Sequence, residues 1–208
     1  MDAAAGQFII TLDGDDRLSP SYAQEAVAVL EADAAATVAY PRVQEFGERN
    51  GLWWPGGGEE LHLKAFAVHS PVAVASAFRR ADWSAVGGFD ESLRIGHEDY
   101  EFWVRLLGRC GGFAAGMPTA TLYYRIRPGS RARTSWAEAR ANTRKAIVEG
   151  ASRETLAALL VGSEEYARQL ERELGRVQHD FLNVRSWPDR AERVGKRVRS
   201  RLRGSRRT

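Results

Sequence analysis

Acidic side chains cluster at two places in this chain of 208 residues, and the first cluster is Asp13-Gly14-Asp15-Asp16. It directly follows an apolar run from Phe8 to Leu12. Carboxylates this close together repel one another unless a cation neutralises them, and Mg²⁺ or Mn²⁺ prefers hard oxygen ligands together with substrate phosphates. The pattern therefore indicates a divalent-cation site. A solvated turn, or negative charge at the start of the helix expected after Ser19-Pro20, is the alternative.

The second cluster is the pair Glu98-Asp99, which follows the stretch Gly87-Gly88-Phe89-Asp90-Glu91. Apolar residues at helical spacing after this pair predict a helix from Glu98 to Arg109 with both carboxylates in its first turn. Helix capping and compensation of the helix dipole would explain the pair without any chemistry. His97 has no second His or Cys at metal-binding spacing and is expected to be a loop residue.

Three further groups of side chains could contact a ligand. Arg79-Arg80 could hold phosphate, although surface ion pairs explain an arginine pair equally well. Trp53 and Trp54 could stack on a sugar ring or pack against the protein. Tyr123-Tyr124-Arg125 follows an apolar segment near the end of the region that reads as a sheet.

The elements that must position these residues alternate between strands and helices, which predicts an α/β fold. Phe8 to Leu12 is short and rich in β-branched residues, as expected for a strand of a parallel sheet buried on both faces. Further strands are expected over 37–46, with a break at Pro41, over 72–80 and over 121–126. Helices are expected after Pro20, over 82–86 and over 98–109. After Ser135 the composition turns to Ala, Arg and Glu with helix-capping residues. We therefore expect a domain over 1–135 and a helical extension over 136–208.

Composition excludes several classes of protein. Cys110 is the only cysteine, so the chain has no internal disulfide and no cysteine-rich zinc site. It contains no P-loop or G-x-G-x-x-G motif, no apolar run of membrane-spanning length and no recognisable signal peptide. We expect a cytoplasmic location, with peripheral attachment at the inner membrane surface left open.

Basic charge is concentrated at the C-terminal end of the chain. Residues 185–208 contain ten Lys or Arg and two acids. Val194, Val198 and Leu202 recur every four residues among these arginines, which predicts a cationic helix with a narrow apolar stripe. Such a helix could contact anionic lipid or nucleic acid, or be solvated. No specific nucleic acid is expected.

Taken together, residues 3 to 130 resemble the family 2 glycosyltransferases, which are inverting enzymes that use nucleotide-sugar donors. The resemblance rests on the order and spacing of four motifs, over 8–22, 79–91, 98–106 and 124–125. It implies part of a GT-A fold, a three-layer α/β/α sheet that lacks the family's first strands. Those strands hold the nucleotide base and would precede Met1.

The resemblance also implies roles for individual residues. Asp15, assisted by Asp13, would face an Mg²⁺ or Mn²⁺ ion and the donor diphosphate. Asp99 would be the general base, with Glu98 beside it. The remaining implied residues are Arg80, Tyr124 and Arg125 on the donor side, and Gly88, Phe89, Asp90 and Trp54 on the acceptor side.

The implied partners are a nucleotide-sugar donor and a glycan or lipid-linked acceptor, as in the assembly of cell-envelope polysaccharide. The chain departs from the family pattern after Tyr124-Arg125, where many members have a His before a serine and this chain has Arg127-Pro128-Gly129-Ser130. Two other functions stay open: a noncatalytic remnant that binds sugar or a partner, and a protein that acts through its basic tail on membrane or nucleic acid.

Overall fold

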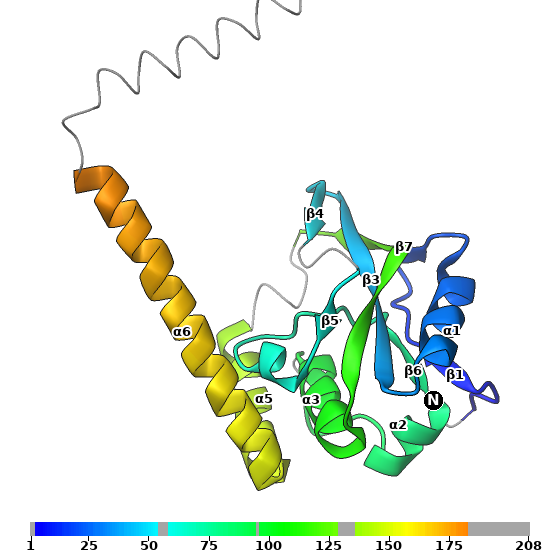
Figure 1. Cartoon of the computed structure of the whole chain (residues 1–208). Coiled ribbons are helices and arrows are strands. Elements are labelled where there is room, and N and C mark those ends of the chain that lie inside the picture. The colour runs from blue at the N-terminus through cyan, green and yellow to red at the C-terminus, as the bar shows by residue number, and fades with distance from the viewer. Residues whose placement is uncertain (1–2, 54–57, 95, 129–135, 183–208) are drawn as a thin grey trace, which may run out of the picture. The chain divides into compact units, whose positions relative to one another are not determined.

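The computed structural model describes residues 3–53, 58–94, 96–128 and 136–182. They form a mixed sheet with helices on both faces (Figure 1). The strands are β1 (Phe8–Ile10), β2 (Arg17–Leu18), β3 (Ala36–Gly47), β4 (Gly51–Trp53), β5 (Glu60–Leu61), β6 (Ala77–Arg79) and β7 (Phe113–Ile126). The helices are α1 (Tyr22–Ala32), the 3₁₀ helix η1 (Leu63–Phe66), α2 (Arg80–Val86), α3 (Glu98–Cys110), α5 (Trp136–Gly150) and α6 (Arg153–Leu182).

The sheet is centred on the two long strands β3 and β7, which run parallel to each other. The strand order is β1-β6-β3-β7-β2, with β4 on β3 and β5 on β7. Side chains alternate across β3 with the period of two expected for a strand. Val38 and Tyr40 face the core beneath α3, and Ala39 faces the core beneath α1. The expected α/β/α layering is confirmed.

The strand predicted at Phe8 is present, but the prediction that it belongs to a parallel pair is wrong. β1 runs antiparallel to β6, and Phe8 and Ile10 are only half-buried. An apolar run of this length indicates a strand but carries no information about the direction of its neighbour. The break expected at Pro41 is wrong: β3 continues through Pro41, where a shift in register with β7 between Tyr40 and Arg42 accommodates the missing amide hydrogen.

Two other expected elements are shorter or begin later. Over 72–80 only Ala77–Arg79 is a strand, because Val72, Ala73 and Ala75 are buried in a loop rather than paired. Helix α1 begins at Tyr22. Ser19 bonds with β7 instead, since its amide donates to the Thr121 carbonyl (2.9 Å) and its hydroxyl accepts from the Thr121 amide (3.1 Å).

The first compact unit extends to Glu164, beyond the composition change near residue 135, and the second covers 165–208. The first unit continues because α5 packs against α3, with Ala139, Thr143 and Ile147 buried. These compact units do not test where the family domain ends, so the boundary near residue 135 stays a prediction. Among the described residues, no helix has the length and apolar character needed to cross a bilayer.

Candidate active site

The loop with Asp13, Asp15 and Asp16 connects β1 to β2 and is closed by a turn in which the Asp16 amide donates to the Asp13 carbonyl (3.1 Å). β2 then pairs antiparallel with β7, placing Arg17 opposite Tyr123. The acids are therefore held against the carboxyl end of β7, about 110 residues later in the sequence.

Contacts from the end of β7 fix the conformation of this loop. The Arg125 amide donates to Asp16 Oδ1 (2.8 Å) and its Nε donates to the Asp15 carbonyl (3.1 Å). Arg127 forms an ion pair with Asp15 through Nη2 and Oδ2, at 2.5 Å. Tyr124 and Arg125 were expected near the acids, and the structure brings them there. The Arg127 contact had no counterpart in the sequence pattern.

Asp16 is the buried acid of the loop. Its Oδ2 is enclosed and has no hydrogen-bond partner among the described residues. Burial raises the pKa of Asp16, and the charges of Asp15 and Asp13 raise it further, whereas the amide of Arg125 lowers it. Asp16 thus anchors the loop to β7, while Asp13 is exposed and Asp15 is half-buried.

The pair Glu98-Asp99 lies in the first turn of α3, as predicted. The residue before it, His97, has a left-handed backbone (φ 63°), which is unusual for a residue other than glycine. The His97 carbonyl accepts from the Glu101 amide (3.4 Å) and from the buried Thr143 hydroxyl of α5 (3.3 Å). This turn sets the direction in which α3 begins. Within the first turn of the helix, Asp99 Oδ1 accepts a hydrogen bond from the Tyr100 amide (2.8 Å).

Electrostatic coupling links the two acidic clusters. The pKa of Asp99 is raised to about 6, chiefly by burial, then by the charge of Glu98 and also by that of Asp13. Burial raises the pKa of Tyr124, and the charges of Asp16, Asp13, Asp15 and Asp99 raise it further. Because such effects fall off with distance, all four carboxylates lie near enough to Tyr124 to act on its pKa.

An open pocket of about 480 Å³ adjoins the acids. Its lining residues are Gly14, Asp15, Asp16, Arg17, Arg125, Ile126, Arg127 and Pro128. The guanidinium groups of Arg17 and Arg125 lie 4.8 and 4.6 Å from the ring centre of Phe46, which holds both side chains by cation–π contact. Three guanidinium groups at a pocket with carboxylates suit an anionic ligand.

A metal ion is compatible with the donor atoms here but would need ligands from outside the protein. Within 3–53, 58–94, 96–128 and 136–182, no group of three or more His, Cys, Asp or Glu is arranged to hold a metal. The oxygen ligands of Asp13 and Asp15 and the unpaired Oδ2 of Asp16 match the preference of Mg²⁺ or Mn²⁺ for hard donors. Both ions commonly complete their shell with water and phosphate.

The residues expected on the acceptor side make structural contacts beside α3. Arg105 donates from Nη2 to the Gly88 carbonyl (2.8 Å) and pairs with Glu101. Phe89 stacks on Phe102, with ring centres 4.3 Å apart. Asp90 Oδ1 accepts from the Ser92 amide (2.9 Å). These contacts tie the turn to the helix that carries Asp99; Trp54 lies outside the described residues.

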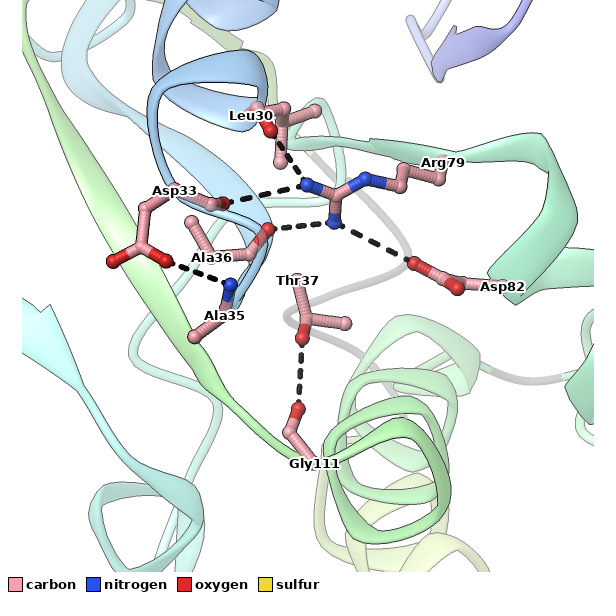
Figure 2. Close-up of polar contacts among 8 residues, drawn as sticks. All are labelled: Leu30, Asp33, Ala35, Ala36, Thr37, Arg79, Asp82 and Gly111. Atoms are coloured by element: carbon pink, nitrogen blue, oxygen red, sulfur yellow. Dashed lines mark hydrogen bonds and ion pairs between the residues drawn. The ribbon is translucent and has the colours of Figure 1, made fainter.

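Arg80, expected at the donor diphosphate, is not brought to the pocket. It begins α2, is exposed, and its amide donates to the Gln7 carbonyl (2.9 Å) before β1 begins. The acids follow the opposite end of β1. Its neighbour Arg79 donates to the carbonyls of Leu30, Asp33 and Ala36 and pairs with Asp82 (Figure 2). Arg79 therefore serves the fold, whereas the side chain of Arg80 is exposed.

Comparisons with known proteins bear on the family and the fold of the chain. Residues 1–85 match the model of the family described as glycosyl transferase family 2. No curated protein matches the chain.

Similar solved structures include S. aureus TarS 1-349, with a TM-score of 0.53, 16% identity, and coverage of 81% of this chain and 50% of that one. TarS 1-349 in complex with UDP-GlcNAc gives a TM-score of 0.56 at 17% identity over 76% of this chain and 47% of that one. At this identity the likeness establishes the fold, and the chain spans about half the length of these structures.

Proposed function

Because the chain carries part of a family 2 glycosyltransferase domain, we propose that it transfers a sugar from a nucleotide-diphosphate donor to an acceptor hydroxyl, with inversion at the sugar carbon. One observation carries the proposal: Asp99 and the acids of the 13–16 loop all act on the pKa of Tyr124. This coupling supports the proposal that the base and the diphosphate side belong to one site.

Asp99 is the proposed general base. A carboxylate with a pKa of about 6 is ionised at neutral pH and is more basic than an ordinary aspartate. As the acceptor oxygen attacks the sugar carbon, the bond from that carbon to the diphosphate oxygen breaks, and the hydroxyl proton passes to Asp99. Glu98 favours this transfer because its charge raises the pKa of Asp99.

The pocket beside the loop is the proposed diphosphate site. Arg17, Arg125 and Arg127 line it and would neutralise phosphate oxygens. Asp15 and Asp13 would hold the divalent cation, which when bound stabilises charge on the departing diphosphate. We propose a uridine diphosphate sugar as donor, because the similar TarS structures are complexes with UDP-GlcNAc and with UDP. A glycan or lipid-linked hydroxyl, positioned near Gly88 to Asp90, is the proposed acceptor.

The test measures release of UDP from UDP-GlcNAc, UDP-glucose and UDP-galactose in the presence of Mn²⁺. Asp99→Asn and Asp15→Ala should each lower the rate by about 10²- to 10⁴-fold, the usual contribution of a positioned base or of charge stabilisation. Exposed Glu31→Gln on α1 is the matched control and should retain the rate. Equal rates for all three variants would refute the assigned roles, and UDP binding without turnover would favour the noncatalytic remnant.

Measuring the stability of Asp99→Asn distinguishes a variant that has lost the chemical step from one that has lost its folded structure. Burial and Glu98 disfavour the ionised form of Asp99, so its neutral replacement in Asp99→Asn should not lower the free energy of unfolding at pH 7.5. Urea denaturation checks this. An inactive Asp99→Asn protein that is also unfolded would not support the base assignment.

A further inference from the structure

Cationic side chains are concentrated at two places in the chain. The basic segment over 185–208 lies outside the described residues, whereas Arg17, Arg125 and Arg127 line the pocket beside the acidic loop. Two of the other lining residues are acids. The lining therefore carries more positive than negative charge, which attracts an anion and repels a cation that arrives alone.

The three arginines differ in how they are held. Arg17 and Arg125 lie on the ring of Phe46, and Arg125 also donates from Nε to the Asp15 carbonyl. Arg127 follows the last residue of β7, and its side chain is 57% exposed. Its guanidinium contacts the carboxylate of Asp15 (Nη2 to Oδ2, 2.5 Å). Because an exposed ion pair contributes little free energy, Arg127 can leave Asp15 readily when a stronger anion is present.

The partner of Arg127 is one of the two carboxylates proposed to hold the divalent cation. A guanidinium and a divalent cation that contact the same carboxylate repel each other strongly, because they lie so close together. Arg127 therefore competes with the cation for Asp15. A diphosphate in the pocket changes this balance, because its oxygens offer the guanidinium an alternative anionic partner.

We propose that the ion pair between Arg127 and Asp15 makes cation binding at this site depend on the diphosphate. Without the diphosphate, Arg127 occupies Asp15. When a diphosphate enters the pocket, Arg127 moves to its phosphate oxygens and leaves Asp15 available to the cation. This role rests on the proposed function, since it concerns the donor site of that reaction. It means that cation and diphosphate each strengthen the binding of the other.

Mn²⁺ binding to the full chain without nucleotide tests the competition and requires no turnover. The measurement is the electron paramagnetic resonance signal of free Mn²⁺. Arg127→Gln removes the competing guanidinium and should bind Mn²⁺ about 3- to 10-fold more tightly than the unchanged protein. Arg127→Lys keeps the positive charge and should bind Mn²⁺ as weakly as the unchanged protein.

Binding of UDP, measured by isothermal titration calorimetry at saturating Mn²⁺, should change in the opposite direction. Arg127→Gln loses a contact with phosphate and should bind UDP about 3- to 10-fold more weakly. A residue that only supported the fold would weaken the binding of both ligands when replaced. Opposite changes for Mn²⁺ and UDP therefore identify the exchange, and weaker binding of both in Arg127→Gln overturns it.

Two other arginines provide matched controls. Arg17→Gln removes the same charge from the same pocket but leaves the ion pair, and Arg109→Gln removes it from the exposed end of α3. Both should raise the affinity for Mn²⁺ by less than Arg127→Gln does. An equal increase in Arg17→Gln, or an unchanged Mn²⁺ affinity in Arg127→Gln, overturns the competition but leaves the proposed function standing. Failure of every variant to bind Mn²⁺ and UDP overturns both.

Discussion

The four carboxylates of the site differ in what surrounds them. Asp16 is buried and bonded to the Arg125 amide, Asp15 is paired with Arg127, and Asp13 is exposed. Asp99 lies where burial and like charge raise its pKa to about 6. Similar residues thereby have different surroundings: Asp15 and Asp16 line the pocket, Asp16 also anchors the loop, and Asp99 is the proposed base.

The pH dependence of sugar transfer should report the ionisation of Asp99. The rate is expected to rise with pH through about 6 as Asp99 loses its proton and becomes competent as a base. Glu98→Gln removes a negative charge that raises this pKa, so the rising limb should move to lower pH by about 0.5 to 1 unit. The measurement is kcat/KM between pH 5 and 8.

Exposed Glu91→Gln, in the loop before α3, serves as the control for this profile and should leave the midpoint in place. A midpoint that stays unchanged or moves to higher pH in Glu98→Gln would contradict the assignment of the limb to Asp99.

Among the elements, α1 depends on an arginine from a strand that lies far away in sequence. Arg79 of β6 donates to the carbonyls of Leu30 (2.5 Å) and Asp33 (3.4 Å) at the end of α1, and to Ala36 (2.8 Å) at the start of β3 (Figure 2). α1 has no basic residue in its last turn. Arg79 therefore supplies from outside the helix the positive charge that helix carboxyl ends favour.

Arg79→Ala should lower the free energy of unfolding by about 2 to 3 kcal/mol, because it removes several charge-assisted hydrogen bonds and leaves half-buried carbonyls without a partner. Arg80→Ala, an exposed neighbour, should change it by less than about 0.5 kcal/mol. Urea denaturation of both variants measures the difference. Arg80→Ala should also leave binding of UDP unchanged, and weakened UDP binding would restore Arg80 to the donor site.

At the level of the whole molecule, the first compact unit includes helices that composition had assigned to an extension. Thr143 of α5 bonds to the His97 carbonyl next to the proposed base. Thr155, near the start of α6, packs against Gly108 at the end of α3. The helices after residue 135 thus support α3 at both of its ends.

Two glycines of α6 test this assignment. A Cβ at Gly162 would lie 2.1 Å from the backbone carbonyl oxygen of Lys64, whereas a Cβ at Gly175 would meet nothing within 4 Å. Gly162→Ala should destabilise the protein by about 2 to 3 kcal/mol through overpacking. Gly175→Ala should stabilise the helix by about 0.5 to 1 kcal/mol. Thermal unfolding followed by circular dichroism measures both, and equal effects would argue against packing of residues 153–164 within the first unit.

Much of the fold could be predicted because its pattern is local. The helices at 82–86 and 98–109, the strand over 37–46 and the α/β class follow from spacing, capping residues and glycines, and all are confirmed except for the break expected at Pro41. The pairing of β1 could not be predicted, since strand direction depends on a partner about 70 residues away. Arg80 does not line the pocket for a related reason: adjacent residues of one motif need not face the same site.

The sequence by itself determined the residue types of the site, because carboxylates, a tyrosine and arginines in a given order and spacing are properties of the chain. Only the tertiary structure decided which of them meet. The pairing of β2 with β7 brings the 13–16 loop to Arg125 and Arg127, and the left-handed turn at His97 sets the start of α3 and Asp99. The raised pKa of Asp99 follows from that burial and from its charged neighbours, which exist only after strands distant in sequence have paired.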